Sequence, residues 1–263
     1  MEYKMEYKFN AETVTDALVT WIQNWFDRNG KDCNAVIGLS GGKDSTILCA
    51  LLVKALGKDR VITVGMPGQG QDLHGADEIA KYFGVKFIVV PIDTLESFYQ
   101  CNIELTKQAK MNIAPRIRMV TLYAISQSNN GRVIGTTNLD EHMLGYFTKF
   151  GDGLASDCEP MEKLTVNELR AIGDYLGIPK KWVYKTPSAD LPNVSTDEEE
   201  FGFTYEEFGN YIRGLKEPSE EIAVKMEERM DANLFKHFDI ESFDPWVYLY
   251  RAKVDNPTEE NGY

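Results

Sequence analysis

A short run of small and charged residues has the composition of a phosphate-binding loop. It reads Ser40-Gly41-Gly42-Lys43-Asp44-Ser45 and lies directly before an apolar helical pattern. Two glycines let the backbone approach a bulky anion with its N–H groups turned inward, and the helix N-terminus adds partial positive charge. Ser40 and Ser45 can donate hydrogen bonds to phosphate oxygens, whereas Asp44 is suited to bind Mg²⁺ beside the phosphates. The run therefore predicts a nucleotide site, and the structural alternative is a glycine turn with Asp44 as a helix cap.

Short apolar stretches that alternate with amphipathic ones predict the elements that hold this loop. Strands are expected at 35–39, 61–66, 86–92 and 132–135, and helices at 46–56, 72–83 and 116–127. Such alternation is typical of an α/β protein, here a doubly wound and mostly parallel five-stranded sheet with helices on both faces. Ligands of such sheets lie at the carboxyl ends of the strands, and the loop follows the first strand.

The flanking segments give no sign of a second domain. Apolar residues at helical spacing, including Trp21 and Trp25, predict a helix at 10–30 that packs within the chain or contacts a second subunit. A further helix is expected at 166–176. Residues 217–263 are expected to form a C-terminal extension, helical at 217–230 and disordered at 255–263. We therefore expect a single domain over residues 1–263.

The composition argues against several classes of protein. A chain of 263 residues of which 43% are hydrophobic is long and apolar enough to bury a full core. Charged residues make up 26% of the chain, and its net charge is −13. This acidic balance argues against nucleic acid as a partner. No apolar stretch approaches the roughly 18 residues of a membrane helix, and the start has no secretory signal pattern. Four scattered cysteines are typical of reduced thiols in a cytoplasmic protein.

Two other residue types are expected to be structural. Some apolar residues further along the chain are expected to pack in the core: Met111, Met119, Phe147 and Phe150. The histidines are expected to form neither a metal-ligand cluster nor a catalytic pair: His74, His142 and His237.

The loop differs from a Walker loop, because Gly42-Lys43 is followed by Asp44 instead of Ser or Thr. It resembles the signature of the N-type ATP pyrophosphatases, which have an adenine nucleotide alpha-hydrolase-like fold. In that superfamily the loop holds the pyrophosphate leaving group while a substrate group is adenylylated at the α-phosphate. Its members include NAD synthetase, GMP synthetase, asparagine synthetase and several tRNA-modifying enzymes. The loop by itself does not choose among them.

A second set of motifs narrows the choice. The chain carries Asn112-Ile-Ala-Pro-Arg-Ile-Arg-Met119, then residues 133–141 and 145–152, and later Pro187-Ser-Ala-Asp-Leu191 and Asp197-Glu198. In order and spacing these motifs resemble NAD synthetase from about residue 35 to about residue 214.

The resemblance implies a role for each matching position. Asp44 and Glu141 would share a Mg²⁺ that bridges the ATP phosphates, and with Arg118 they form the implied catalytic set. ATP would be bound by Gly38, Leu39, Ser40, Gly41, Gly42, Lys43, Asp44, Ser45, Thr136, Ser188 and Lys163. The deamido-NAD substrate would be bound by Arg118, Lys149, Asp157, Lys236 and His237.

Two positions depart from the family pattern. Val166 occupies the place of a family lysine that lies against the ATP phosphates, and Lys163 is the nearby lysine that could replace it. The family's basic pair near the C-terminus is represented by Lys236-His237.

The implied reaction is the ATP-dependent amidation of deamido-NAD to NAD. ATP adenylylates the nicotinate carboxylate with release of pyrophosphate, and ammonia then displaces AMP. Because the chain begins almost directly at the synthetase region, it leaves no room for a glutamine-hydrolysing domain and favours free ammonia. The family also implies a homodimer.

Two alternatives stay open. The chain could be another N-type ATP pyrophosphatase, amide-forming or tRNA-modifying, although the acidic charge and residues 145–152 argue against the tRNA-modifying kind. It could also be an ATP-binding homologue with weakened catalysis, which the presence of Val166 would explain.

Overall fold

A parallel sheet forms the centre of the molecule. The computed structural model of the chain describes residues 7–185 and 196–237, and within them the strands are β1 (Asn34–Gly38), β2 (Val61–Gly65), β3 (Lys86–Val89) and β4 (Gly131–Val133). Their order is β3-β2-β1-β4, with Ala35 opposite Val61 and Asn34 opposite Gly131. The chain therefore builds outward from β1 to β3 and then returns to the other side of β1. The order reverses between β1 and β4, and the predicted doubly wound α/β class is confirmed.

The number of strands differs from the prediction, because the described residues form four strands and not five. In the fifth position, beside β4, only a single parallel bridge joins Ile134 to Cys158. The Asp157 carboxylate accepts the N–H of Val133 at 2.7 Å, where a fifth strand would offer a backbone carbonyl. A side chain thus replaces part of the ladder in a segment rich in Gly and Asp, which disfavour strands.

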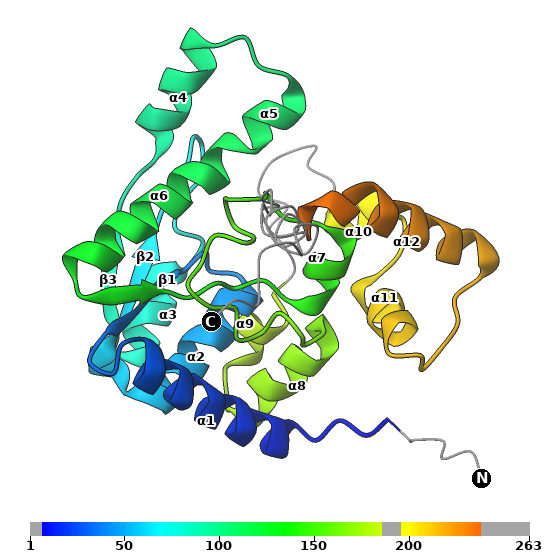
Figure 1. Cartoon of the computed structure of the whole chain (residues 1–263), viewed down its shortest axis with the longest axis horizontal. Helices are drawn as coiled ribbons and strands as arrows, with labels where there is room; N and C mark the ends of the chain where they lie inside the picture. The colour runs from blue at the N-terminus through cyan, green and yellow to red at the C-terminus, as the bar shows by residue number, and fades with distance from the viewer. Residues whose placement is uncertain (1–6, 186–195, 238–263) are drawn as a thin grey trace, which may run out of the picture.

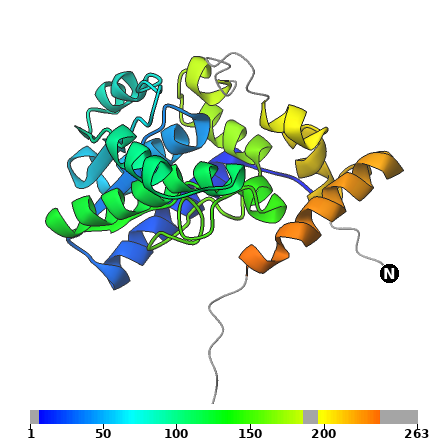
Figure 2. The same ribbon diagram turned by 90° about the horizontal axis from the view of Figure 1, so that it is seen from above.

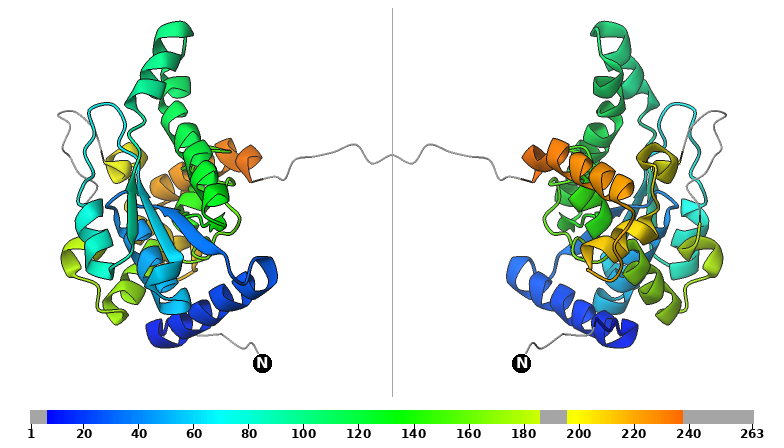
Figure 3. Two further views of the ribbon diagram at one scale, coloured as in Figure 1. Left: turned by 90° about the vertical axis from the view of Figure 1, so that its left-hand side faces the viewer. Right: turned by 90° about the vertical axis from the view of Figure 1, so that its right-hand side faces the viewer.

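Helices cover both faces of the sheet, as the edge-on views of Figure 3 show. On one face lie α1 (Ala11–Asn29), α2 (Lys43–Leu56), α3 (Ala76–Phe83), α8 (Val166–Tyr175) and α9 (Lys180–Val183), with the short η1 (Lys58–Arg60) after α2. On the other lies α6 (Ile113–Ser128), preceded by α4 (Asp93–Asn102) and α5 (Lys107–Met111), which project from the body in Figure 1. Strand β1 alternates between the two cores, since Ala35 and Ile37 face the first and Val36 the second.

A smaller apolar core lies beside the sheet. It joins α7 (Leu139–Leu144), α10 (Asp197–Phe201), α11 (Tyr205–Ile212) and α12 (Glu220–Asn233), which η2 (Leu234–Lys236) follows. Leu144, Phe208 and Met226 are fully buried there. Figure 2 shows α12 extending along this side of the molecule.

Several predicted elements are confirmed with shifted ends. Helix α1 matches the expected helix at 10–30: Asn10 caps it by accepting the Thr13 N–H at 2.9 Å, and Ile22 and Phe26 are buried within the chain. The helix expected at 72–83 begins only at Ala76, because His74 and Gly75 have positive φ. The expected disorder at 255–263 falls outside the described residues.

The prediction that Met111, Met119, Phe147 and Phe150 pack in the core is wrong for two of them. The Met111 side chain is 56% exposed, and Phe150 is 43% exposed at a turn where its φ is +58°. Both side chains lie on the surface because of their positions in a helix and in a turn, which residue type does not reveal.

No helix in the described part of the chain combines the length and the apolar character needed to cross a membrane.

Candidate active site

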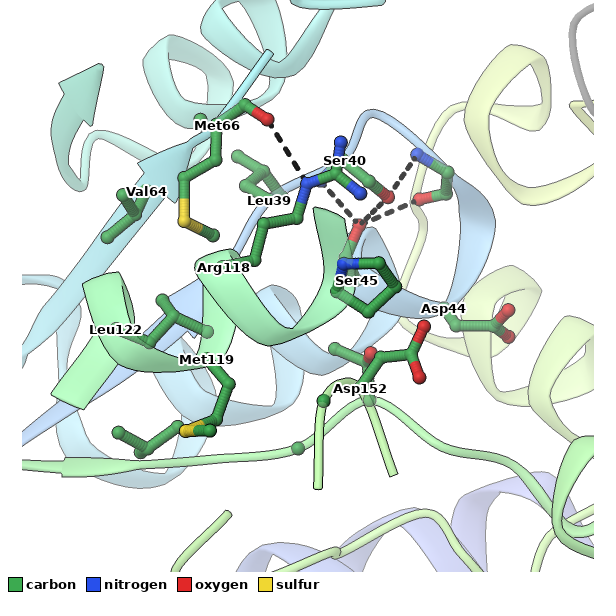
Figure 4. Close-up of a pocket in the computed structure, with 18 of the residues that line it drawn as sticks. Leu39, Ser40, Asp44, Ser45, Val64, Met66, Arg118, Met119, Leu122 and Asp152 are labelled. Atoms are coloured by element: carbon green, nitrogen blue, oxygen red, sulfur yellow. Dashed lines mark hydrogen bonds between the residues drawn. The ribbon is translucent and has the colours of Figure 1, made fainter. Parts of the chain in front are cut away.

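A cavity of about 380 Å³ opens at the carboxyl ends of β1 and β4, where the strand order reverses. This is the position at which doubly wound sheets bind their ligands. Its lining comes from the loop after β1, the end of β2, α6, the segment after β4 and residues 151–156. Figure 4 shows how these side chains converge.

The loop is held in shape by its own hydroxyl groups. The Ser40 N–H donates to Ser45 Oγ at 3.3 Å, and the Gly42 N–H donates to Ser40 Oγ at 3.2 Å (Figure 4). Gly41 has a φ of +77°, and a Cβ at this position would overlap the His74 carbonyl, so only glycine fits without strain. Helix α2 begins at Lys43 with Gly42 as its N-cap and no side-chain cap. The alternative of Asp44 as a capping residue is therefore wrong.

Asp44 and Glu141 place two carboxylates near each other. Asp44 Oδ1 is buried and has no hydrogen-bond partner among the described residues. Glu141 lies in the first turn of α7, where its side chain accepts the Asn138 N–H in a capping box. Burial, and then the charge of Asp44, raises the pKa of Glu141. A hard divalent cation prefers such carboxylate oxygens.

Other ligands would have to complete the coordination of such a cation. Within the described ranges, no group of three or more His, Cys, Asp or Glu side chains could hold a metal ion. Two carboxylates together with phosphate oxygens and water match the usual way in which Mg²⁺ is bound beside a nucleotide.

Asp140, next to Glu141 in α7, is a third carboxyl group that interacts with the charge of Asp44. It is fully buried, its Oδ2 accepts the Val166 N–H at 2.8 Å, and burial raises its pKa to about 7. The Val166 side chain is fully buried in the small core. This position therefore supplies packing and a backbone N–H to the region, and no cation.

Arg118 is the guanidinium of the cavity. Its Nε donates to the Met66 carbonyl at 3.2 Å and its Nη2 to Gln71 Oε1 at 2.8 Å, as Figure 4 shows for the first of these bonds. Burial lowers the pKa of Arg118, while the charges of Glu96 and Asp152 act in the opposite direction. Gln71 and Asp152 also line the cavity, and neither was predicted from the sequence to have a role there.

Glu159 is a second residue that the sequence did not reveal. Its carboxylate accepts the Ser156 hydroxyl at 2.7 Å and the Thr137 N–H at 3.2 Å, and burial raises its pKa to about 7. A Cβ at Gly135 would overlap this carboxylate, so a larger residue there would displace the Glu159 side chain. Glu159 thereby links Ser156, which lines the cavity, to Thr137, which follows the cavity-lining residue Thr136.

Lys185 was also missed. Its ammonium donates to the Gly41 carbonyl at 3.2 Å and to the His74 carbonyl at 2.7 Å. It therefore joins the phosphate loop to the loop before α3. The only available signal was its place just before the motif Pro187-Ser188.

The structure brings together most of the residues expected to bind ATP. Of these, Gly38, Leu39, Ser40, Gly42, Asp44, Ser45 and Thr136 line the cavity, whereas Gly41 does not. Arg118 and Glu141, which were expected to have substrate-binding and metal-binding roles, line the same cavity. Lys43 belongs to the loop, but its side chain is directed to Asp44. Lys163 is exposed and does not line the cavity, and Ser188 lies outside the described residues.

Four residues expected to bind substrate lie away from the cavity lining, and we refer to them as the outer group: Lys149, Asp157, Lys236 and His237. Lys236 donates to the Gly145 and Phe147 carbonyls at 2.5 and 3.0 Å, and Lys149 donates to the Phe235 carbonyl at 3.2 Å. These lysines thus tie η2 to the end of α7 and the turn that follows it. Asp157 binds the Val133 N–H and the Tyr123 hydroxyl instead.

His237 of the outer group lies close to His142 of α7, a contact that the sequence did not suggest. His237 Nδ1 lies 3.2 Å from His142 Nε2, and His142 Nδ1 lies 3.1 Å from Glu162 Oε1. This contact was not expected from the sequence, since α7 and η2 are adjacent only in the fold. The expectation that the histidines form no catalytic pair stays a prediction.

A doubly wound parallel sheet with this loop at its switch point defines the class as an adenine-nucleotide-binding α/β enzyme. A family model described as NAD synthase matches residues 14–241 of the chain. The chain therefore belongs to the NAD synthase family, whose members are ligases.

Individual relatives agree with this family. The NH(3)-dependent NAD(+) synthetase of Methanococcus aeolicus is 39% identical over 220 residues, which cover 80% of this chain and 85% of the relative. Among solved structures, the NMN synthetase from Francisella tularensis matches with a TM-score of 0.81 and 31% identity, covering 90% of this chain and 100% of that one. The NH3-dependent NAD synthetase from Campylobacter jejuni matches with a TM-score of 0.72 and 27% identity over 90% of this chain and 100% of that one.

Proposed function

We propose that the chain catalyses the ATP-dependent amidation of deamido-NAD to NAD with ammonia. The observation that carries this proposal is the single cavity that contains the phosphate loop, the carboxylates of Asp44 and Glu141, and Arg118. The names of relatives that share 39% identity supply the product, NAD, and the nitrogen source, ammonia.

The reaction has two balanced steps. A nicotinate carboxylate oxygen attacks the α-phosphorus of ATP, and the bond to the β-phosphate oxygen breaks to release pyrophosphate. Ammonia then attacks the acyl carbon, AMP leaves with the electron pair, and the nitrogen loses a proton to give the amide. No covalent enzyme intermediate is needed, so the contribution of the protein is to position two anions and neutralise their charge.

The residues of the cavity fit these tasks. The backbone N–H groups and hydroxyls of the loop bind the pyrophosphate part of ATP at the N-terminus of α2. Arg118, held by Met66 and Gln71, orients the carboxylate that is adenylylated. The unpartnered Asp44 oxygen and Glu141 would hold Mg²⁺, which when bound would neutralise phosphate charge.

A second candidate substrate is nicotinate mononucleotide, with NMN as the product. The higher TM-score and identity of the Francisella tularensis NMN synthetase, 0.81 and 31% against 0.72 and 27%, favour this candidate. Both reactions amidate the same nicotinate carboxylate. They differ only in whether the substrate carries an adenylyl group.

Dimerisation and location belong to the same proposal. The apolar surface of α4, α5 and α6, with Phe98 61%, Met111 56% and Val120 62% exposed, supports a contact with a second copy. Helix α1 offers less apolar surface for such a contact, because Val19, Ile22 and Phe26 are buried in the chain, although Trp21 is 42% exposed. Phe98→Glu is expected to produce a monomer in analytical ultracentrifugation, and an unchanged dimer would place the contact elsewhere.

A cytoplasmic location agrees with four cysteines that are all unpaired.

The function is tested by a coupled assay with ATP, Mg²⁺, ammonium and either deamido-NAD or nicotinate mononucleotide, using Asp44→Ala as the inactive variant. We expect NAD from deamido-NAD with the wild type and no product with Asp44→Ala. A larger kcat/KM with nicotinate mononucleotide would select the second candidate. The absence of both products from a folded, ATP-binding wild type would refute the proposal.

A further inference from the structure

Lys43 is part of the phosphate loop, but its side chain does not line the cavity. Its ammonium lies 3.0 Å from Asp44 Oδ2, and only 15% of the Lys43 side chain and 16% of the Asp44 side chain are exposed. It also lies over the ring of Tyr205, 5.4 Å from the centroid. A buried ammonium is therefore held against one of the two carboxylates that we assign to the metal.

The surroundings of Lys43 favour this position. Asp44 and Glu141 both attract the ammonium and oppose the cost of its burial. Tyr205, which is only 5% exposed, is itself fixed, because its hydroxyl donates to Asp197 Oδ2 at 3.1 Å and its N–H to Glu198 Oε1 at 2.9 Å. The aromatic face and the carboxylates together form a compartment for one cation.

The two oxygens of Asp44 are thus in different states. Oδ2 is engaged by Lys43, whereas Oδ1 is buried without a partner in the described part of the chain. A divalent cation bound at Oδ1 would lie close to the ammonium and be repelled by it. Nucleotide phosphates would add negative charge and offset this repulsion.

We propose that Lys43 is a resident counter-ion of the metal carboxylates, which weakens the binding of a divalent cation until nucleotide phosphates are present. The inference rests on the proposed metal role of Asp44 and Glu141. A metal ion without nucleotide meets an Asp44 carboxylate that the Lys43 ammonium already neutralises. The binding of the metal and the binding of the nucleotide are therefore strongly coupled. By reciprocity, loss of the Lys43 charge reduces the factor by which each ligand improves the affinity of the other.

Direct metal binding to the nucleotide-free full chain tests the inference. Mn²⁺ is titrated and its free concentration is followed by electron paramagnetic resonance, for the wild type, Lys43→Gln and Lys54→Gln. Lys54 lies on the same helix and is exposed, so Lys54→Gln is a control for the loss of one positive charge. We expect Lys43→Gln to bind one Mn²⁺ about 10-fold or more tightly than the wild type, and Lys54→Gln to match the wild type.

Further variants separate this inference from the proposal on which it depends. Adding Asp44→Asn to Lys43→Gln is expected to remove the tight site; if that site persists, the metal role of Asp44 fails. Equal or weaker Mn²⁺ binding by a folded Lys43→Gln overturns the role of Lys43 while the metal role of Asp44 stands.

Lys43→Arg keeps the charge and should bind Mn²⁺ as weakly as the wild type. Tight Mn²⁺ binding by Lys43→Arg would overturn the electrostatic explanation. If Lys43→Gln does not fold, the titration of Lys43→Arg is the second measurement.

Discussion

The cavity and the outer group both contain charged residues from recognised motifs, but they use them differently. In the cavity, an Asp44 oxygen has no partner among the described residues, and the cavity itself leaves room for a ligand. In the outer group, Lys236 donates to backbone carbonyls and Asp157 accepts a backbone N–H. The difference teaches that membership of a motif does not tell whether a charge faces a ligand or holds the fold together.

The physical distinction is in what a truncation would leave behind. Removing a ligand-facing charge lowers transition-state stabilisation and leaves the folded state nearly intact. Removing a charge that binds a buried backbone group leaves that group without a partner and destabilises the fold. Activity and stability measurements on matched variants can therefore separate the two regions.

The largest effect is expected for Arg118→Ala, which removes the guanidinium from the cavity. We expect kcat/KM to fall on the order of 10³-fold, because the substrate carboxylate loses its orienting cation. The assay is product formation under initial-rate conditions, with urea unfolding as the check on stability. Arg28→Ala, an exposed change on α1, should leave the rate unchanged, and a small loss for Arg118→Ala would remove this residue from the catalytic set.

The next effect concerns pH and Glu159, whose pKa is raised to about 7 by burial. A carboxyl group with a raised pKa in the folded state binds protons more tightly than in the unfolded chain. Its contribution to stability is therefore present below about pH 4.5 and is lost as the pH rises through 7. Relative to Glu159→Gln, we expect the free energy of unfolding of the wild type to decrease by up to about 3 kcal/mol across this range.

Urea unfolding at several pH values measures the Glu159 effect. Comparison with Glu159→Gln cancels the contributions of the other buried carboxyl groups, since both proteins contain them. Parallel stability curves for the two proteins would show that Glu159 does not titrate in this range.

A smaller effect on stability is expected for Asp157→Ala in the outer group. The buried Val133 N–H would lose its partner at the edge of β4, which costs about 2 kcal/mol. Asp157→Asn keeps an acceptor oxygen and should cost less. If Asp157→Ala instead raises KM for the nicotinate substrate without changing the unfolding midpoint, Asp157 belongs with the substrate residues and the comparison breaks down.

The smallest effect is expected for Lys185→Met, which removes the link between the phosphate loop and the loop before α3. We expect KM for ATP to rise about 10-fold, because the loop carbonyls lose a charged donor and the loop is less well ordered. Lys185→Arg should retain part of the affinity. The exposed Lys180→Met is the matched control, and equal KM values for Lys180→Met and Lys185→Met would exclude this positioning role.

The sequence by itself determined the local features of this protein. The run Ser40 to Ser45 specified the phosphate loop, because a glycine pair before a helix has few conformations and a clear electrostatic use. The alternation of strands and helices specified the α/β class and the position of the loop at the end of β1. Motif order indicated the NAD synthase family, which the family match confirmed.

Only the tertiary structure decided which distant groups meet. The carbonyls of Gly41 and His74 attract Lys185 from more than 100 positions away along the chain. The Asp157 carboxylate takes one of the hydrogen-bonding positions of a fifth strand, because it reaches the edge of β4. His142 meets His237, and Lys43 meets Tyr205, where α7, α11 and η2 are brought beside the sheet. Periodicity and spacing describe neighbours along the chain. These contacts depend on how the helices pack against one another, which cannot be inferred from local sequence patterns.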